Sequence, residues 1–271
     1  MKINIANIFG GIIIALTITS CEDFLSREPI DKVNADTWFS SETDLLLYAN
    51  GMLQSYLPSE STIGLGDAYC DLVATKTSSD YYRLGVWNST KQTGWAYSDW
   101  ENVRRANYMM ENMVRSKGKV DDIIYNHYDG VAHFWRAFFY YSKIRTFGDV
   151  PWIDKVLEEN DPAIYAQRDD RELVMHHVLE DLNFACENLQ GSGSFTDGRT
   201  QINKWVALAF KSRVCLFEGT YRKYHQVNPS TNKPWNGQYE SADDFLKEAA
   251  DAAEELMTTG GFELYNTGNP S

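Results

Sequence analysis

The chain has 271 residues, of which 43% are hydrophobic and 14% aromatic, and its formal net charge is −13 at pH 7. This apolar content excludes a disordered chain, and the length is enough for one large domain or two small ones. The acidic balance argues against nucleic acids and anionic membrane surfaces as partners, because both attract positive charge.

The first twenty residues have the pattern of a secretory signal peptide. Lys2 is followed by an apolar run from Ile8 to Ile18 and then by small residues. A helix that spans a bilayer needs about twenty apolar residues, and this run is much shorter. We therefore interpret residues 1–20 as a cleaved leader, and we expect no transmembrane helix in the chain.

The residues around Cys21 indicate what happens at the cleavage site. Ile18-Thr19-Ser20-Cys21 is similar to a bacterial lipobox, in which the cysteine is acylated and becomes the first residue of the mature protein. A diacylglycerol together with an N-acyl chain would give stable membrane attachment, which a single chain does not. We predict that Cys21 is lipidated; the alternative is ordinary secretion with a free or disulfide-bonded Cys21.

Six segments after the leader carry hydrophobic residues at helical spacing. Residues 21–40 precede them, contain Pro29 and show no such period, so we interpret them as an extended tether. Ser40 and Ser41 are the expected caps of the first helix, and Asp99 is that of the second. The six segments are 40–57, 98–116, 128–146, 171–190, 202–224 and 241–259.

The apolar positions also predict how these helices pack. Segments 128–146 and 202–224 are apolar on two faces and must be covered on both, whereas 171–190 has one apolar stripe and a charged opposite side. Gly148 and Pro151 end the third segment, since glycine can take a positive φ and proline cannot continue a helix. The stripe expected for segment 98–116 is Trp100, Val103, Asn107, Met110 and Val114.

The alternation of helices and turns predicts a mainly α fold. Stacked helical hairpins of the tetratricopeptide type, forming an α-α superhelix with long irregular loops, would produce this order of elements. We assign residues 41–271 to this helical domain and expect one short strand at the sequence FELY, residues 262–265.

Motifs for catalysis or metal binding are not found in the sequence. No two histidines are spaced at i, i+4, and the adjacent His176 and His177 should point about 100° apart on a helix. Cys70, Cys186 and Cys215 match neither a disulfide framework nor a zinc motif, and the last two have the surroundings of buried residues. We expect no metal and no cofactor. A secreted glycoside hydrolase remains an alternative. Its two catalytic carboxylates need to be close in space and not in sequence, so the sequence does not reveal them.

A group of aromatic residues lies in and just after the long segment between the first two helices. Sugar rings stack on aromatic side chains, while amides hydrogen-bond their hydroxyls, and loops often carry function. The alternative is that these rings fill the core, Trp100 especially. The group comprises Tyr81, Tyr82, Trp87, Trp95, Tyr97 and Trp100. The ligand-binding candidates that we select from this stretch are Tyr81, Tyr82, Trp87, Asn88 and Trp95.

Several segments, in this order, resemble the SusD/RagB family of outer-membrane nutrient-binding lipoproteins. The most specific is RAFFYYSKIRTFGDVP, and the next is the lipobox with FLSREP after it. Further matches are Phe39 ahead of the first helix, Trp100 with Asn107, the sequence VLEDLNFACENL, and Lys204 to Phe217.

This resemblance implies a function that the composition does not show. Such proteins have a helical, tetratricopeptide-like scaffold, lie lipid-anchored on the outer membrane facing the exterior, and pass glycans or, in some members, peptides to a TonB-dependent (SusC-like) transporter. They bind and do not catalyse. A docking subunit that contacts the transporter without touching the ligand is the alternative. Members are about twice as long, so we expect this chain to correspond to the N-terminal part of such a protein.

Overall fold

The computed structural model describes residues 38–56, 93–191 and 201–264. Within these residues the chain is mostly helical, with six α-helices, three short 3₁₀ helices and one small sheet. The α-helices are α3 (Glu42–Tyr56), α5 (Glu101–Asn112), α6 (Asp122–Phe147), α7 (Arg171–Asn188), α8 (Lys204–Tyr224) and α9 (Ala242–Thr259). The 3₁₀ helices are η4 (Tyr97–Trp100), η5 (Met113–Ser116) and η6 (Pro162–Tyr165).

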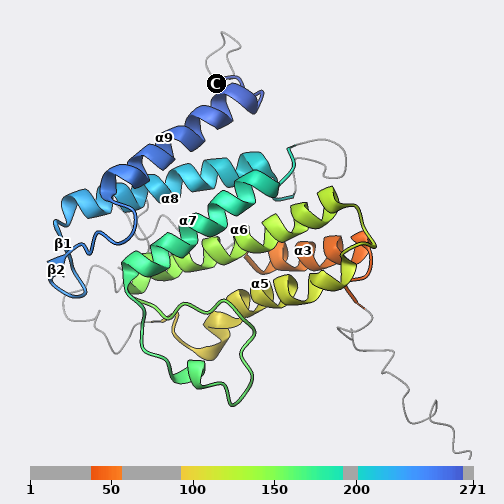
Figure 1. The fold of residues 1–271 in the computed structure, drawn as a ribbon, viewed down its shortest axis with the longest axis horizontal. Coiled ribbons are helices and arrows are strands. Elements are labelled where there is room, and N and C mark those ends of the chain that lie inside the picture. The colour runs from red at the N-terminus through yellow and green to blue at the C-terminus, as the bar shows by residue number, and fades with distance from the viewer. Residues whose placement is uncertain (1–37, 57–92, 192–200, 265–271) are drawn as a thin grey trace, which may run out of the picture. The chain divides into compact units, whose positions relative to one another are not determined.

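Consecutive helices pack against each other along the chain. Helix α5 contacts α6, α6 contacts α7, α7 contacts α8 and α8 contacts α9, while α3 packs on both α5 and α6 (Figure 1). This succession of neighbouring helices confirms the predicted fold class of stacked helical hairpins. The sheet consists of β1 (Val227–Asn228) and β2 (Lys233–Pro234), which pair antiparallel in the connection between α8 and α9.

Helix α6 lies at the centre of this arrangement. Its buried residues come from all sides of the helix, among them Tyr128, Phe134, Ala137 and Tyr140. This confirms the prediction that it is covered on more than one face. The helix ends as predicted at Gly148, which has a φ of 73° and donates its N–H to the carbonyl of Ile144 at 3.0 Å.

Three helix boundaries differ from the sequence prediction. Asp99 does not cap α5; its carboxylate accepts a hydrogen bond from Ala96 N at 2.8 Å and so caps η4. At the other end η5 turns by about 120° per residue instead of 100°. Met113 is therefore fully buried, and Val114, expected in the stripe, is 55% exposed. Helix α6 also begins six residues earlier than expected, at Asp122.

Three further expectations about packing need correction. The predicted apolar stripe of α7 is buried, but the opposite side is not simply charged and solvated, because Glu172 and Asp181 are buried beside arginines. On α8, both apolar faces were expected to be covered, but Leu216, which belongs to one of them, is 52% exposed. The sequence FELY forms no strand as far as Leu264, the last residue described, since no described strand lies there to pair with it.

The start of the described chain is fixed by an aromatic contact. Phe39, which the sequence places at the end of the tether, is 1% exposed and contacts the rings of Tyr48 and Tyr108 at 5.0 and 6.1 Å. Its φ is 61°, a left-handed conformation that is unusual for an aromatic residue. After it, Ser41 and Asp44 form reciprocal hydrogen bonds that cap α3 as predicted.

Cys186 and Cys215 are both buried and free, as the sequence predicts. Burial raises the pKa of each thiol to about 12, so both remain protonated and unreactive at neutral pH. Across the described residues, each helix is too short or too polar to cross a membrane.

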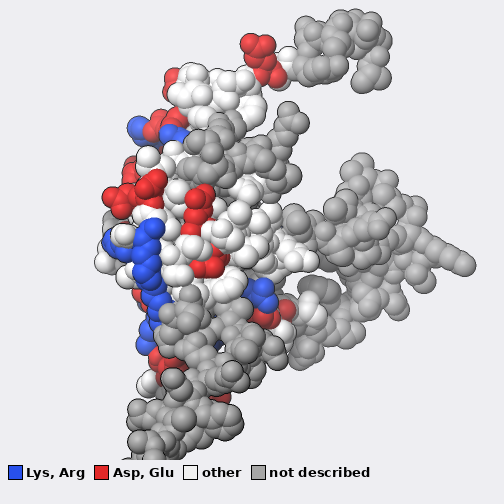
Figure 2. All heavy atoms as spheres, turned by 90° about the vertical axis from the view of Figure 1, so that its right-hand side faces the viewer, with Lys and Arg blue, Asp and Glu red and all other residues white. Residues whose placement is uncertain are grey.

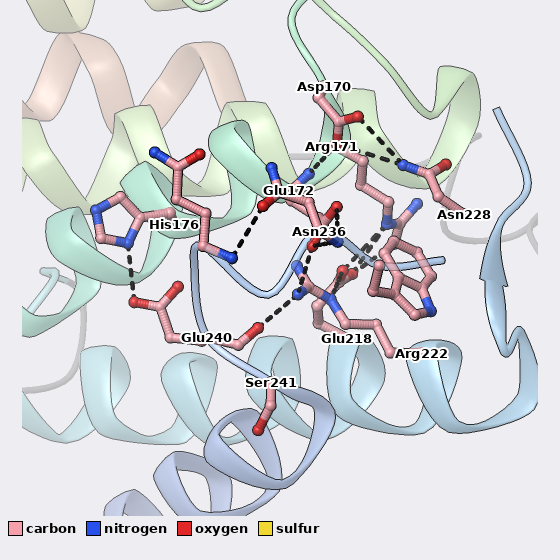
Figure 3. Close-up of polar contacts among 12 residues, drawn as sticks. Asp170, Arg171, Glu172, His176, Glu218, Arg222, Asn228, Asn236, Glu240 and Ser241 are labelled. Atoms are coloured by element: carbon pink, nitrogen blue, oxygen red, sulfur yellow. Dashed lines mark hydrogen bonds and ion pairs between the residues drawn. The ribbon is translucent and has the colours of Figure 1, made fainter. Parts of the chain in front are cut away.

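A layer of buried charge joins α7 to α8 (Figure 3). Glu218 on α8 receives Arg171 of α7 at 2.6 Å and Arg222, one turn further along α8, at 2.8 Å. Arg171 and Glu218 are 3% and 0% exposed. Arg222 also donates to the carbonyl of Glu240 at 2.6 Å, just before α9 begins. Glu218 therefore pairs with two guanidinium groups across α7 and α8, and Glu172 of α7, 3.9 Å from Arg222, is a second buried carboxylate in this layer.

We expect the substitution Glu218→Ala to lower the free energy of unfolding by about 3–5 kcal/mol, because it leaves the buried Arg171 without its carboxylate and Arg222 with only Glu172, at 3.9 Å. Urea denaturation followed by circular dichroism measures the change. The matched control is Lys223→Ala on the same helix, α8. It removes an exposed ion pair with Asp243 of α9 and should cost less than about 1 kcal/mol. Equal effects of the two substitutions would contradict this account of the buried layer.

The burial of His127 predicts a pH dependence of stability. Burial lowers the pKa of His127 from 6.5 to about 4. Protonation therefore favours the unfolded state, and stability is lost as the pH falls from about 6.5 towards 4. The full difference amounts to about 3 kcal/mol. Between pH 7 and pH 4.5, the urea midpoint should fall less in His127→Gln than in the natural protein. An identical fall in both proteins would refute the role of His127.

Candidate functional site

Of the five predicted ligand-binding residues, the structure describes only Trp95. Tyr81, Tyr82, Trp87 and Asn88 lie outside the described residues, as does Cys21. Trp95 is 38% exposed and precedes η4, whose first residue, Tyr97, is 88% exposed. These two rings define the candidate site that the structure can describe, and we call them the Trp95–Tyr97 surface.

Trp95 is held by aromatic and cationic neighbours. Its ring meets Trp100 and Phe147 edge to face at 5.2 and 4.8 Å, and the guanidinium of Arg168 lies 4.4 Å from its centroid. Trp100 in turn packs on Phe139 of α6 at 5.4 Å. Trp100 thus has the packing role that we expected for it. Trp95 fits both roles considered for the aromatic group, core packing and ligand contact, because one part of its ring packs and the rest faces solvent.

Lys143 of α6 fixes the backbone next to Trp95. Its ammonium group donates to the carbonyl of Gly94 at 2.6 Å and lies 5.2 Å from the ring centroids of both Trp100 and Phe139. Burial lowers the pKa of Lys143, and the negative charge of Asp99 opposes this shift. The lysine is therefore a positioning residue beneath the surface, with its charge directed at a backbone oxygen and at ring faces.

The connection between α6 and α7 supplies Arg168 and is tied to α5. Asn107, which is fully buried, donates to the carbonyls of Ile153 and Lys155 at 2.9 and 3.1 Å. Arg104 donates to the carbonyl of Leu157 at 2.8 Å. These side chains replace the backbone hydrogen bonds that a regular element would provide, so an irregular segment can hold a defined position.

Asn107 is itself oriented by a buried ion pair. Arg136 of α6 donates to the Asn107 side-chain oxygen at 3.2 Å and to both oxygens of Asp181 on α7 at 2.8 and 2.7 Å. Burial acts to raise the pKa of Asp181, but hydrogen bonds from Arg136 and His133 outweigh it and hold that pKa below its ordinary value. The pair stays charged at neutral pH and links α5, α6 and α7.

The described surface carries charges of both signs. On the face shown in Figure 2, lysine and arginine side chains are interspersed with aspartate and glutamate, without a continuous basic area. The formal net charge of the whole chain is −13. Around Trp95, the groups available to a ligand are the exposed part of the indole, the Tyr97 ring and the Arg168 guanidinium, which suit stacking and hydrogen bonding.

Sequence reasoning missed several residues that the structure makes important. Tyr97 belonged to the aromatic group but was not selected, although it is more exposed than Trp95. The sequence contains no indication of a role for Arg168, because its partner, Trp95, lies far away along the chain. A histidine and carboxylate group, His176, His177 and Glu180, could hold a metal ion; the search for paired histidines overlooked it because the third member is a glutamate.

A family model matches most of this chain, and the match decides the family. The model is described as "Starch-binding associating with outer membrane", and it covers residues 23–216. The chain belongs to the SusD-like family. The resemblance to the SusD/RagB family that the sequence suggested is thereby confirmed.

Curated relatives of this SusD-like chain come from Formosa agariphila. "SusD-like protein P2" is 24% identical over 222 residues, which are 78% of this chain and 43% of the relative. "SusD-like protein P38" is 27% identical over 230 residues, 80% of this chain and 43% of the relative. The chain therefore spans less than half the length of the relatives that it matches.

Solved structures of SusD-like proteins share the fold. One from Bacteroides fragilis has a TM-score of 0.60 at 22% identity, over 89% of this chain and 42% of that one. A SusD homolog from Bacteroides thetaiotaomicron has a TM-score of 0.60 at 16% identity, over 86% of this chain and 43% of that one. At these identities the likeness supports the helical architecture alone.

We expect Asn107→Ala to release the segment that carries Arg168. The substitution leaves two carbonyls and one arginine group without a partner, at a cost of about 1–3 kcal/mol. Trypsin should then cut after Lys155 or Arg168 in the native protein much faster than before, as followed by mass spectrometry. Asn112→Ala is the control, since Asn112 Nδ2 donates only within its own helix, to Tyr108 O. Unchanged cleavage in Asn107→Ala would show that other contacts hold the segment.

Proposed function

We propose that this protein is a lipoprotein that binds glycans or oligosaccharides at the outer face of the outer membrane and passes them to a TonB-dependent transporter. The observation that carries the binding proposal is the Trp95–Tyr97 surface, where a partly exposed and a largely exposed ring are held on a helical scaffold. Peptides are the other ligand class that such a surface could accept.

The family and its structures support a carbohydrate ligand. The description of the family names starch binding and association with the outer membrane. A relative from Bacteroides fragilis is described as a SusD-like carbohydrate-binding protein; its TM-score is 0.56 at 16% identity, over 83% of this chain and 42% of that one. Because this chain spans less than half of such proteins, Tyr81, Tyr82, Trp87 and Asn88 remain predicted contributors beside the described surface.

The contacts of the surface fit binding better than catalysis. The Trp95 ring is supported by packing on two sides, so its exposed part is preorganised and loses little freedom when a sugar stacks on it. The neighbouring cation, Arg168, can donate hydrogen bonds to hydroxyl or carboxylate groups. We therefore assign no enzymatic activity in this proposal, and we place attachment to the membrane at Cys21.

We expect Tyr97→Ala to weaken glycan binding by about threefold to tenfold, the effect of losing one aromatic contact of about 0.5–1.5 kcal/mol. The measurement is the binding of fluorescent polysaccharides and peptides to intact cells that display the full-length protein. Tyr224→Ala removes another tyrosine that is 86% exposed, at the end of α8, and should have no effect.

The same assay separates the alternatives. Cys21→Ser should remove the cell-bound signal while the purified protein still binds, because only the anchor is lost. If no polysaccharide or peptide binds to the correctly folded protein, the docking role without ligand contact becomes the better account. Equal binding by Tyr97→Ala and the natural protein would place the ligand away from the Trp95–Tyr97 surface.

A further inference from the structure

Two histidines and a glutamate converge on the partly exposed side of α7. His176 Nε2 lies 3.5 Å from Glu180 Oε1, and His177 Nδ1 lies 2.8 Å from Glu180 Oε2. One nitrogen or oxygen atom from each residue lies within 4.8 Å of the other two. The two imidazoles are adjacent in sequence, and their ring centroids lie 5.5 Å apart although helical spacing alone would separate them by about 100°. The Glu180 side chain, one turn further along, reaches both.

Glu240, in the connection before α9, orients the first histidine. Its Oε1 lies 2.8 Å from His176 Nδ1 (Figure 3). With the proton on Nδ1, the lone pair of Nε2 is directed towards Glu180. A histidine whose second nitrogen is bonded to a carboxylate is the usual arrangement of a metal ligand. The other oxygen, Glu240 Oε2, is buried and has no hydrogen-bond partner among the described residues.

Aromatic neighbours hold both imidazole rings while leaving their edges accessible. Trp152 stacks on His177 at 4.7 Å with an interplanar angle of 23°, and Tyr239 lies 4.9 Å from His176. The histidine side chains are 28% and 30% exposed, so an ion from solvent can reach them. Ring positions fixed by packing favour binding, because little side-chain freedom remains to be lost.

We propose that His176, His177 and Glu180 bind a divalent transition-metal cation, with Glu240 as the positioning residue. Two imidazole nitrogens and one carboxylate oxygen form a donor set that suits Zn²⁺ or Ni²⁺ better than Ca²⁺ or Mg²⁺, which prefer oxygen ligands. Three protein ligands leave a coordination position for water or a ligand group. The bound ion fixes His176 against Glu240 and so ties α7 to the start of α9. The site is separate in function from glycan binding.

The test is zinc binding by the full-length protein, purified without a histidine tag. Equilibrium dialysis with elemental analysis gives the stoichiometry, and competition with a chromophoric chelator gives the affinity. We expect one site that His177→Ala and Glu180→Gln weaken at least tenfold. Glu240→Gln should weaken it about tenfold or more through the lost orientation of His176. The control is His225→Gln, which changes an exposed histidine at the end of α8 outside the group, and it should bind as the natural protein does.

Glu180 makes the test independent of folding. Its side chain is 59% exposed, so Glu180→Gln leaves the core untouched, and circular dichroism verifies the fold of each variant. Failure of the natural protein to bind zinc would overturn the proposal, as would undiminished binding in Glu180→Gln. Either result would leave His176 and His177 as histidines that only hydrogen-bond their glutamates. Glycan binding is measured separately, so the two proposals can fail independently.

Discussion

The balance of buried charge between α7 and α8 sets the position of the second half of the described chain. Glu218 compensates Arg171 and Arg222 at once, and Glu172 accepts the backbone N–H of Asn236 at 2.9 Å through each of its oxygens. An unpaired charge here would cost several kcal/mol, so α7 cannot slide or rotate against α8 without breaking the set. The irregular connection to α9 is held by the same charges.

A second buried ion pair stabilises the elements beneath the Trp95–Tyr97 surface. Arg136 and Asp181 fix α6 to α7, and Asn107 extends the network to a connection without regular structure. The Trp95–Tyr97 surface is thus supported from below by polar side chains and by the packing of Trp100 on α6. Apolar contacts alone would allow the connection several positions, whereas hydrogen bonds to named carbonyls allow few.

Periodicity predicted most of the fold because helices bury apolar side chains at regular spacing. The stripe of α7 and the double burial of α6 follow from that rule. Periodicity failed at two kinds of position. The 3₁₀ geometry of η5 turns Val114 outward. Glu172 and Asp181 are buried because arginines from other helices form ion pairs with them. For the site, composition indicated aromatic residues and the segment that contains Trp95. The contact between Trp95 and Arg168 joins segments that are far apart in the chain, and local sequence patterns do not predict such contacts.

Phe39 determines where mechanical load enters the helical unit. Its side chain is buried against Tyr48 of α3 and Tyr108 of α5, whose rings also contact each other, and its left-handed backbone costs about 1–2 kcal/mol that this packing must exceed. A pull on the chain that precedes Phe39 therefore acts first on a buried aromatic ring and not on a free end. Release of this end of the chain from α3 and α5 therefore requires Phe39 to leave its contacts with both tyrosines.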